Sequence, residues 1–156
     1  MEERAARAVE LFKMGYNCSQ SVVGAFADLY GYSLEQGLLM AASFGGGIGR
    51  MREVCGAACG MFLLNGFETG STNPADHAGK VRNYKMVQFL AAEFKKENGS
   101  IICAHLLGLK QKPAELSPVP DSRTEEYYKK RPCVDTVKSA AIIYGNYLLN
   151  KNNRTK

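Results

Sequence analysis

Apolar residues recur at helical spacing along almost the whole chain, and glycine, proline and capping residues interrupt them at intervals. This spacing places apolar side chains on one face of a helix, so it predicts amphipathic helices. We find no convincing strand pattern and no internal repeat. The chain is therefore restricted to an all-α fold. We expect helices over 2–14, 18–30, 34–44, 52–67, from Pro74 to about 98, over 101–108, and from Pro132 to about 150.

The size and composition of the chain fit one self-sufficient domain. It has 156 residues, of which 46% are hydrophobic and 22% charged, as in ordinary soluble globular proteins. We predict a single compact domain of about six to eight helices over residues 1–150. A frayed polar tail is expected over 151–156, and a proline-rich loop over 110–124.

The charge distribution and the lack of a membrane span or secretory signal limit the expected location of the protein and the partners expected for it. No apolar run is long enough to span a membrane, and the N-terminus lacks the features of a secretory signal, so we expect a cytoplasmic protein. The net charge is +5; the first 70 residues carry 5 basic and 7 acidic residues, and the rest carry 15 and 8. The basic half could face an acidic partner protein. Nucleic-acid binding is not favoured, because no nucleic-acid motif accompanies the charge.

Cysteine is the residue type that points most directly to chemistry. The chain has five: Cys18, Cys55, Cys59, Cys103 and Cys133. In a reducing compartment, cysteines bind metals or perform redox chemistry more often than they crosslink a fold. The alternative for any single cysteine is that it packs as a small buried hydrophobe.

Three of the five cysteines follow helix-start residues. Cys18 comes after the expected cap Asn17, Cys133 comes after Pro132, and Cys103 lies in the first turn after Ser100. The free N–H groups and the dipole at a helix start stabilise an anion. A thiol there is driven toward the thiolate, which is both the nucleophile and the metal ligand.

The segment 45–60 is rich in glycine and contains two further cysteines. Gly56 and Gly60 lie four positions apart on the expected helix, as do Cys55 and Cys59. We take Gly56 and Gly60 as candidate cofactor-contacting residues, because glycine lets the backbone approach a ligand closely. The alternatives are close helix packing and a homodimer interface. Two arginines, at positions 50 and 52, could stabilise a thiolate, bind an anionic substrate or be solvated.

Several named chemistries are excluded by missing motifs. There is no Cys-x-x-Cys, so a thioredoxin motif and a zinc ribbon are absent, and there is no Cys-x-x-Cys-His for haem attachment. A Walker loop and a His-Glu-x-x-His motif are also missing, and the glycine run lacks the third glycine of a dinucleotide fingerprint.

The motif Cys55-Gly56-Ala57-Ala58-Cys59-Gly60 and the order of the other cysteines resemble the C_GCAxxG_C_C family of redox-active proteins. Cys18, Cys55, Cys103 and Cys133 look like the four family cysteines, and Cys59 occupies a variable position. The resemblance implies a helical domain. Through the related split-Soret cytochromes it also implies a cysteine-bound iron–sulfur cluster and dimerisation, although the haem motif is absent.

Three functions remain open for these residues. Cys18, Cys55, Cys103 and Cys133 could ligate an iron–sulfur cluster or zinc and transfer electrons with a redox partner protein. The same four cysteines could perform dithiol/disulfide exchange as an oxidoreductase, for which we expect Cys18 to pair with Cys55. The third possibility is a non-redox helical binding module with a basic C-terminal half.

Overall fold

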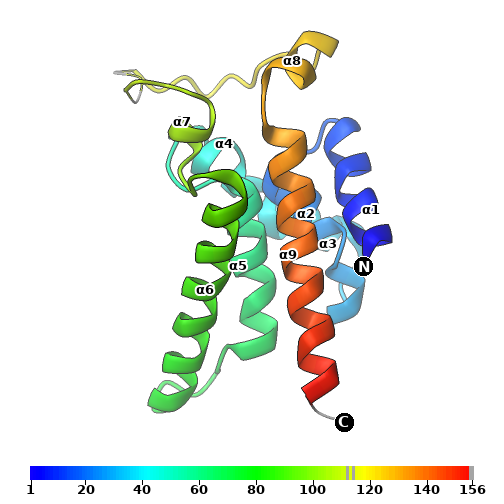
Figure 1. Ribbon diagram of the computed structural model, residues 1–156, viewed down its shortest axis with the longest axis vertical. Coiled ribbons are helices and arrows are strands. Elements are labelled where there is room, and N and C mark those ends of the chain that lie inside the picture. Colours follow the sequence, from blue (N-terminus) through cyan, green and yellow to red (C-terminus); the bar gives the residue numbers. More distant parts are fainter. Residues whose placement is uncertain (112, 114, 155–156) are drawn as a thin grey trace.

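The computed structural model describes residues 1–111, 113 and 115–154, and in this part it confirms the all-α domain (Figure 1). Three long helices lie along one another: α5 (Gly56–Thr69), α6 (His77–Asn98) and α9 (Cys133–Arg154). Helix α1 (Glu2–Lys13) packs against α9, and α2 (Cys18–Gly24) packs against α5. The buried side chains between these helices include Phe12, Phe26, Leu64, Phe94 and Tyr144.

Several helix ends and short helices gather at one end of the molecule. The starts of α5 and α9 and the end of α6 lie at this end, together with three short helices and the loop that precedes α8 (Figure 1). The short helices are α4 (Gly45–Ile48), α7 (Cys103–Leu106) and α8 (Glu125–Lys130). Helix starts from distant parts of the sequence therefore meet at one end of the fold.

The second and third expected helices are interrupted. Over 18–30, α2 is followed by a 3₁₀ turn at Ala27–Tyr30, and over 34–44, α3 (Leu34–Ala41) is followed by a 3₁₀ turn at Ala42–Phe44. The first break is stabilised by Arg4, whose Nη1 donates to the Ala25 carbonyl at 2.7 Å and also pairs with Asp28. A side chain from outside the helix thus donates a hydrogen bond to a carbonyl at the end of the helix.

The helix expected over 52–67 begins only at Gly56. Before it, Val54 forms an isolated antiparallel bridge with Ile102. The Cys55 amide donates to the Ile101 carbonyl at 2.7 Å, and the Cys103 amide donates to the Glu53 carbonyl at 2.7 Å. This extended pairing satisfies backbone groups that a helix would otherwise use, and it brings two cysteine-bearing segments together.

Other boundaries also differ from expectation. Helix α6 begins at His77 rather than Pro74, because the Asp76 side chain caps it and accepts from the Gly79 amide at 2.8 Å. Helix α8, capped by Thr124, was not expected. Helix α9 continues into the segment expected as a tail, and Thr155 and Lys156 lie outside the described residues. In the expected loop 110–124, the described residues form no helix or strand; positions 112 and 114 lie outside them.

None of the helices in the described part of the chain is long and apolar enough to cross a membrane. This agrees with the absence of a long apolar run in the sequence.

Candidate functional site

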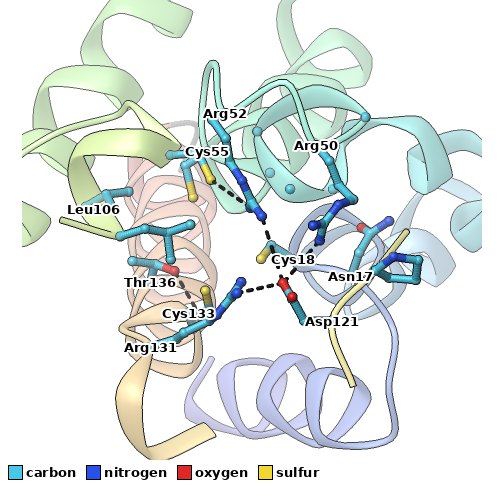
Figure 2. A pocket seen from close by; sticks show the side chains of 18 of the residues that line it. Asn17, Cys18, Arg50, Arg52, Cys55, Leu106, Asp121, Arg131, Cys133 and Thr136 are labelled. Atoms are coloured by element: carbon cyan, nitrogen blue, oxygen red, sulfur yellow. Dashed lines mark hydrogen bonds and ion pairs between the residues drawn. The ribbon is translucent and has the colours of Figure 1, made fainter. Parts of the chain in front are cut away.

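A cavity of about 410 Å³ lies at the end of the molecule where α5 and α9 begin. Its lining includes four cysteines that are far apart in the sequence: Cys18, Cys55, Cys103 and Cys133. Three of them, Cys18, Cys55 and Cys133, are labelled in Figure 2. Cys59 is not among the lining residues; it is buried in α5, and its sulfur faces the Val54 carbonyl at 3.8 Å. The fold therefore brings together the four cysteines that were expected to act together.

Each of these cysteines stands at the start of a helix. Cys18 and Cys133 are the first residues of α2 and α9, as the sequence predicted. Cys103 is the first residue of α7, but this helix has four residues and follows Ile102, so the expected helix over 101–108 with Ser100 as its cap is wrong. Cys55 is the residue immediately before α5, a placement that the sequence pattern did not indicate. The expected cap Asn17 is present: its Oδ1 accepts from the Gln20 amide at 2.9 Å, and the Gln20 side chain accepts from the Asn17 amide.

Two glycines allow the cysteine-bearing segments to approach one another. A Cβ atom on Gly47, which has φ +72°, would lie 2.5 Å from the Cys103 Cβ. A Cβ atom on Gly56 would lie 2.8 Å from the Phe44 carbonyl oxygen and 3.2 Å from the Cys18 Cβ. Any side chain at either position would push a thiol away from the cavity.

The two candidate cofactor-contacting glycines have different surroundings. Gly56 lines the cavity as well as facing α2. Gly60 is not a lining residue, and a Cβ there would lie 2.9 Å from the Val22 Cβ of α2. The small-residue face is therefore used for close packing of α5 on α2 within the chain, which is the alternative we considered for it. It is not free to contact a second copy.

A left-handed stretch of backbone precedes α5 and carries two arginines to the cavity. Positive φ angles run without interruption from Gly46 to Arg50, and Arg52 also has φ +60°. Ile48 and Arg50 both have φ +64°. Non-glycine residues in this conformation cost roughly 1–3 kcal/mol each. The fold maintains this strain at the edge of the thiol cavity.

Arg52 is the most buried charged group of the site. Its side chain is 10% exposed, and its Nη1 donates to the Cys103 sulfur at 3.7 Å. Simple solvation, one of the three roles considered for this arginine, is therefore wrong. Burial raises the pKa of Cys103 above its ordinary value, and the hydrogen bond from Arg52 opposes that rise.

Cys18 and Cys133 both line the cavity, and each thiol shifts the pKa of the other. Both side chains are partly exposed, whereas Cys55 and Cys103 are buried. The hydrogen bond from Cys18 lowers the pKa of Cys133 to about 7, against the effect of burial, and the charges of Arg131, Arg123 and Arg52 lower it further. The pKa of Cys18 is raised by its hydrogen bond to Cys133 and by burial. Of the two thiols, Cys133 is therefore the more readily ionised.

Cys55 and Cys59 remain protonated at neutral pH. Burial raises the pKa of Cys55 to about 12, although the amides of Ala57 and Ala58 oppose the rise. Burial also raises the pKa of Cys59 to about 11. Cys133 thus differs from every other cysteine of the chain in the direction of its pKa shift.

Asp121 links the proline-rich loop to the arginines at the cavity (Figure 2). Its Oδ2 lies 2.6 Å from Arg131 Nη2, 3.2 Å from Arg50 Nη1 and 3.9 Å from Arg52 Nη2. The Arg50 Nε also donates to the Ser117 carbonyl at 2.9 Å. Burial would raise the pKa of Asp121, but Arg50 and Arg131 hold it below its ordinary value.

Sequence reasoning missed three charged residues of the cavity: Asp121, Arg123 and Arg131. Asp121 and Arg123 lie in the loop, Arg131 lies between α8 and α9, and none of the three belongs to a motif. Only the fold places them opposite Arg50 and Arg52, about 70 positions earlier in the chain. A cluster of basic residues just before the last cysteine would have been the one available indication.

The thiols as placed do not form a metal-ligand set. Four thiolates would suit an iron–sulfur cluster or zinc by chemistry. Over the described residues, however, no group of three or more cysteine, histidine, aspartate or glutamate side chains is arranged so that it could hold a metal ion. The metal centre remains a prediction from the sequence and its family resemblance.

Comparison with known proteins connects this site to a family. The family model described as "Putative redox-active protein (C_GCAxxG_C_C)" matches residues 16–147. No curated protein and no solved structure matches the chain. The matched range contains all five cysteines and every charged residue that lines the cavity.

Proposed function

This chain belongs to the C_GCAxxG_C_C family, and from that membership and the arrangement of its thiols we propose that it is a thiol–disulfide oxidoreductase. The observation that carries the proposal is that Cys18 and Cys133 line one cavity, are both partly exposed, and shift each other's pKa in opposite directions. A dithiol that exchanges with disulfides needs one thiolate to attack and one neighbouring thiol to resolve. This pair supplies both.

Cys133 is the attacking thiol in this proposal. Its pKa of about 7 makes a large fraction of it thiolate at neutral pH, and it is partly exposed to the cavity. A thiol with a pKa near the ambient pH combines thiolate population with nucleophilicity. Its position at the start of the long helix α9 and the arginines nearby stabilise the same charge.

The reaction proceeds in two balanced steps. The Cys133 thiolate attacks one sulfur of a substrate disulfide, forms a mixed disulfide and releases the other sulfur as a thiolate. Cys18 then gives up its proton and attacks the Cys133 sulfur, which releases the second substrate sulfur as a thiol. The substrate gains two electrons, and the chain is left with a Cys18–Cys133 disulfide.

The pairing differs from the one expected from the sequence. We expected Cys18 to pair with Cys55, but the largest effect on the pKa of Cys18 comes from Cys133. Cys55 is 4% exposed and has a raised pKa, so it is poorly suited to meet a substrate. We therefore assign the exchange to Cys18 and Cys133.

The proposal is tested by mapping the disulfide that forms on mild oxidation. Reduced protein is treated with oxidised glutathione, free thiols are alkylated, and the peptides are identified by mass spectrometry. We expect one linkage, between Cys18 and Cys133, and we expect it in the Cys59→Ser variant as well. If the oxidised wild-type protein has no Cys18–Cys133 linkage, or has Cys18 linked to Cys55, the assignment is contradicted.

A metal measurement decides between this proposal and the metal–sulfur centre. Iron, acid-labile sulfide and zinc are measured per chain on protein purified without oxygen, together with a visible spectrum. Metal-free protein with an exchanging Cys18–Cys133 pair supports the oxidoreductase. Stoichiometric iron and sulfide that disappear on Cys133→Ser would overturn it. Metal-free protein with ordinary, unreactive thiols would leave a helical binding module.

A further inference from the structure

We propose that Arg50, Arg52 and Arg131 form a binding site for a carboxylate, and that this site selects small disulfides bearing carboxylate groups as substrates. In the described structure the Asp121 carboxylate occupies the site, and a substrate carboxylate would displace it. The inference deepens the proposed function and rests on it for the substrate, while the carboxylate site itself is testable independently.

The charge of the cavity is the first argument. Four arginines line it, and Asp121 is the one carboxylate among the described lining residues. Arg123 is engaged elsewhere: it donates to the carbonyls of Phe12 and Tyr16 at 3.2 and 3.1 Å, and its guanidinium lies 4.4 Å from the centre of the Phe12 ring. The other three guanidinium groups face the same carboxylate. The cavity therefore holds more positive than negative charge.

Burial makes this excess charge informative. The side chains of Arg50 and Arg131 are 22% and 25% exposed, and that of Arg52 is 10% exposed. Removing a guanidinium from water is costly unless an anion compensates it. One carboxylate shared by three arginines compensates them in part, so a further anion in the cavity would be stabilised.

The backbone conformation is the second argument. Arg50 and Arg52 both have positive φ angles, of 64° and 60°. Such strain at non-glycine residues persists where the surrounding structure holds it, and it clusters at binding and catalytic sites. Here it directs two guanidinium groups toward Asp121 (Figure 2).

The position of Asp121 makes it displaceable. It lies in a segment without helix or strand, and its side chain is 43% exposed. Replacing it by a substrate carboxylate exchanges one anion for another, so the charge balance at the arginines is kept. Arginine binds carboxylates with good geometry because its donors match two oxygens.

The three arginines and the reactive thiol line the same cavity, and this limits the substrate to a short molecule. Arg131 lies two positions before Cys133, and Arg52 contacts the Cys103 sulfur. A volume of about 410 Å³ suits a small molecule. A carboxylate held by the arginines would leave a disulfide a few bonds away next to the Cys133 sulfur.

The test compares two small disulfides of similar length and opposite charge. Reduced protein is oxidised by 3,3′-dithiodipropionate, a dianion, or by cystamine, a dication, and both rates are followed by quenched alkylation. We expect the dianion to react faster. The readout is the ratio of the two rate constants, because a change in Cys133 ionisation acts on both rates alike.

Matched variants separate this site from the overall charge. Asp121→Asn frees the arginines and should raise the ratio about fivefold, the size of one ion-pair contribution, and Arg50→Gln should lower it by a similar factor. Asp28→Asn is the control for the first change, because Asp28 pairs with Arg4 away from the cavity. Arg7→Gln is the control for the second. Neither control should change the ratio.

A second measurement does not depend on thiol chemistry. Suberate has the length and charge of 3,3′-dithiodipropionate but no disulfide, and its binding is measured by calorimetry. We expect Asp121→Asn to bind suberate more tightly and Arg50→Gln less tightly than wild type. Suberate binding that fits these expectations, with no reaction of either disulfide, would refute the proposed function but retain the carboxylate site. Equal rate ratios and equal suberate affinities in all variants would overturn the inference.

Discussion

Cys133 and Cys18 show how two identical side chains acquire opposite acid–base behaviour. The hydrogen bond between them lowers the pKa of Cys133 and raises that of Cys18, and three arginines add to the effect on Cys133. The charges of Arg131, Arg123 and Arg52 lower the pKa of Cys133, while burial raises the pKa of both thiols. The reactivity of the site is therefore set by neighbours of the cysteines rather than by the cysteines themselves.

Replacing Cys18 tests this account directly. In Cys18→Ala the hydrogen bond to Cys133 is lost, so the pKa of Cys133 should rise from about 7 toward its ordinary value. The measurement is the rate at which iodoacetamide alkylates Cys133 as a function of pH, by mass spectrometry. Cys59→Ala is the control and should leave the midpoint in place. A midpoint that does not move in Cys18→Ala would assign the shift to the arginines alone.

Local sequence predicts some of the site and not the rest. Cys18 could be placed because Asn17 and Gln20 form a capping box three residues apart, which the sequence displays. Cys55 could not be placed, because the start of its helix depends on a backbone pairing with residues 101–103. Nothing in the sequence near Asp121 indicates its place in the cavity, because its role depends on arginines far away in the sequence.

At the scale of elements, the left-handed stretch before α5 is the part that organises the cavity. Its backbone groups bond across the turn: the amides of Arg52 and Glu53 donate to the carbonyls of Gly46 and Gly47 at 3.3 and 2.9 Å. Periodicity could indicate that the glycine run interrupts a helix. Periodicity could not indicate that the turn is left-handed. Ile48, Arg50 and Arg52 have positive φ angles in it, and residues of these types rarely adopt such angles.

Gly47 is a position in this stretch that cannot accept a side chain without strain. Gly47→Ala should lower the free energy of unfolding by about 2 kcal/mol or more, because the residue has positive φ and its Cβ would clash with Cys103 and with the Arg52 backbone. Urea unfolding measures the change. Gly66→Ala is the matched control: Gly66 lies inside α5 with open space around it. That change should raise the free energy by roughly 0.5–1 kcal/mol. Equal effects would contradict the proposed role of the turn.

Most helices could be predicted, and those that differ do so for tertiary reasons. The range 2–14 matches α1 because its apolar stripe and Gly15 are local features. The range 18–30 is divided because Arg4, from another helix, bonds to the Ala25 carbonyl. Helix propensity cannot report on a partner that only the fold supplies.

For the whole molecule, the five thiols make stability depend on pH in two opposite ways. The ordinary thiol pKa is 9.0, and that of Cys133 is lowered to about 7. Between these values the unfolded chain holds a proton that the folded protein has lost, so the free energy of unfolding rises with pH. This contribution is complete above pH 9 and is lost as the pH falls through 7. The other four thiols have raised pKa values. Above pH 9 they ionise only in the unfolded chain, so stability falls.

We therefore expect the thiol contribution to stability to peak near pH 9. The measurement is urea unfolding of the reduced protein between pH 6 and 10.5. In Cys133→Ser the rise between pH 7 and 9 should be absent, whereas Cys59→Ser should retain it. A wild-type curve with no such rise would show that Cys133 has an ordinary pKa in the folded protein.

The positions of Cys18 and Cys133 have a topological consequence. They stand near opposite ends of the chain, at the starts of α2 and α9, and the loop that carries Asp121 lies between them in sequence. Under the proposed function, oxidation turns most of the polypeptide into a covalent ring with a short arm on one side and α9 on the other. Closing a ring of this length restricts the unfolded chain by about 4–5 kcal/mol in the chain-entropy model. If the loop were cut in the oxidised protein, the ring would open but the disulfide would still join the two pieces. In the reduced protein no covalent bond would join them, so the redox state would decide whether the pieces stay covalently connected.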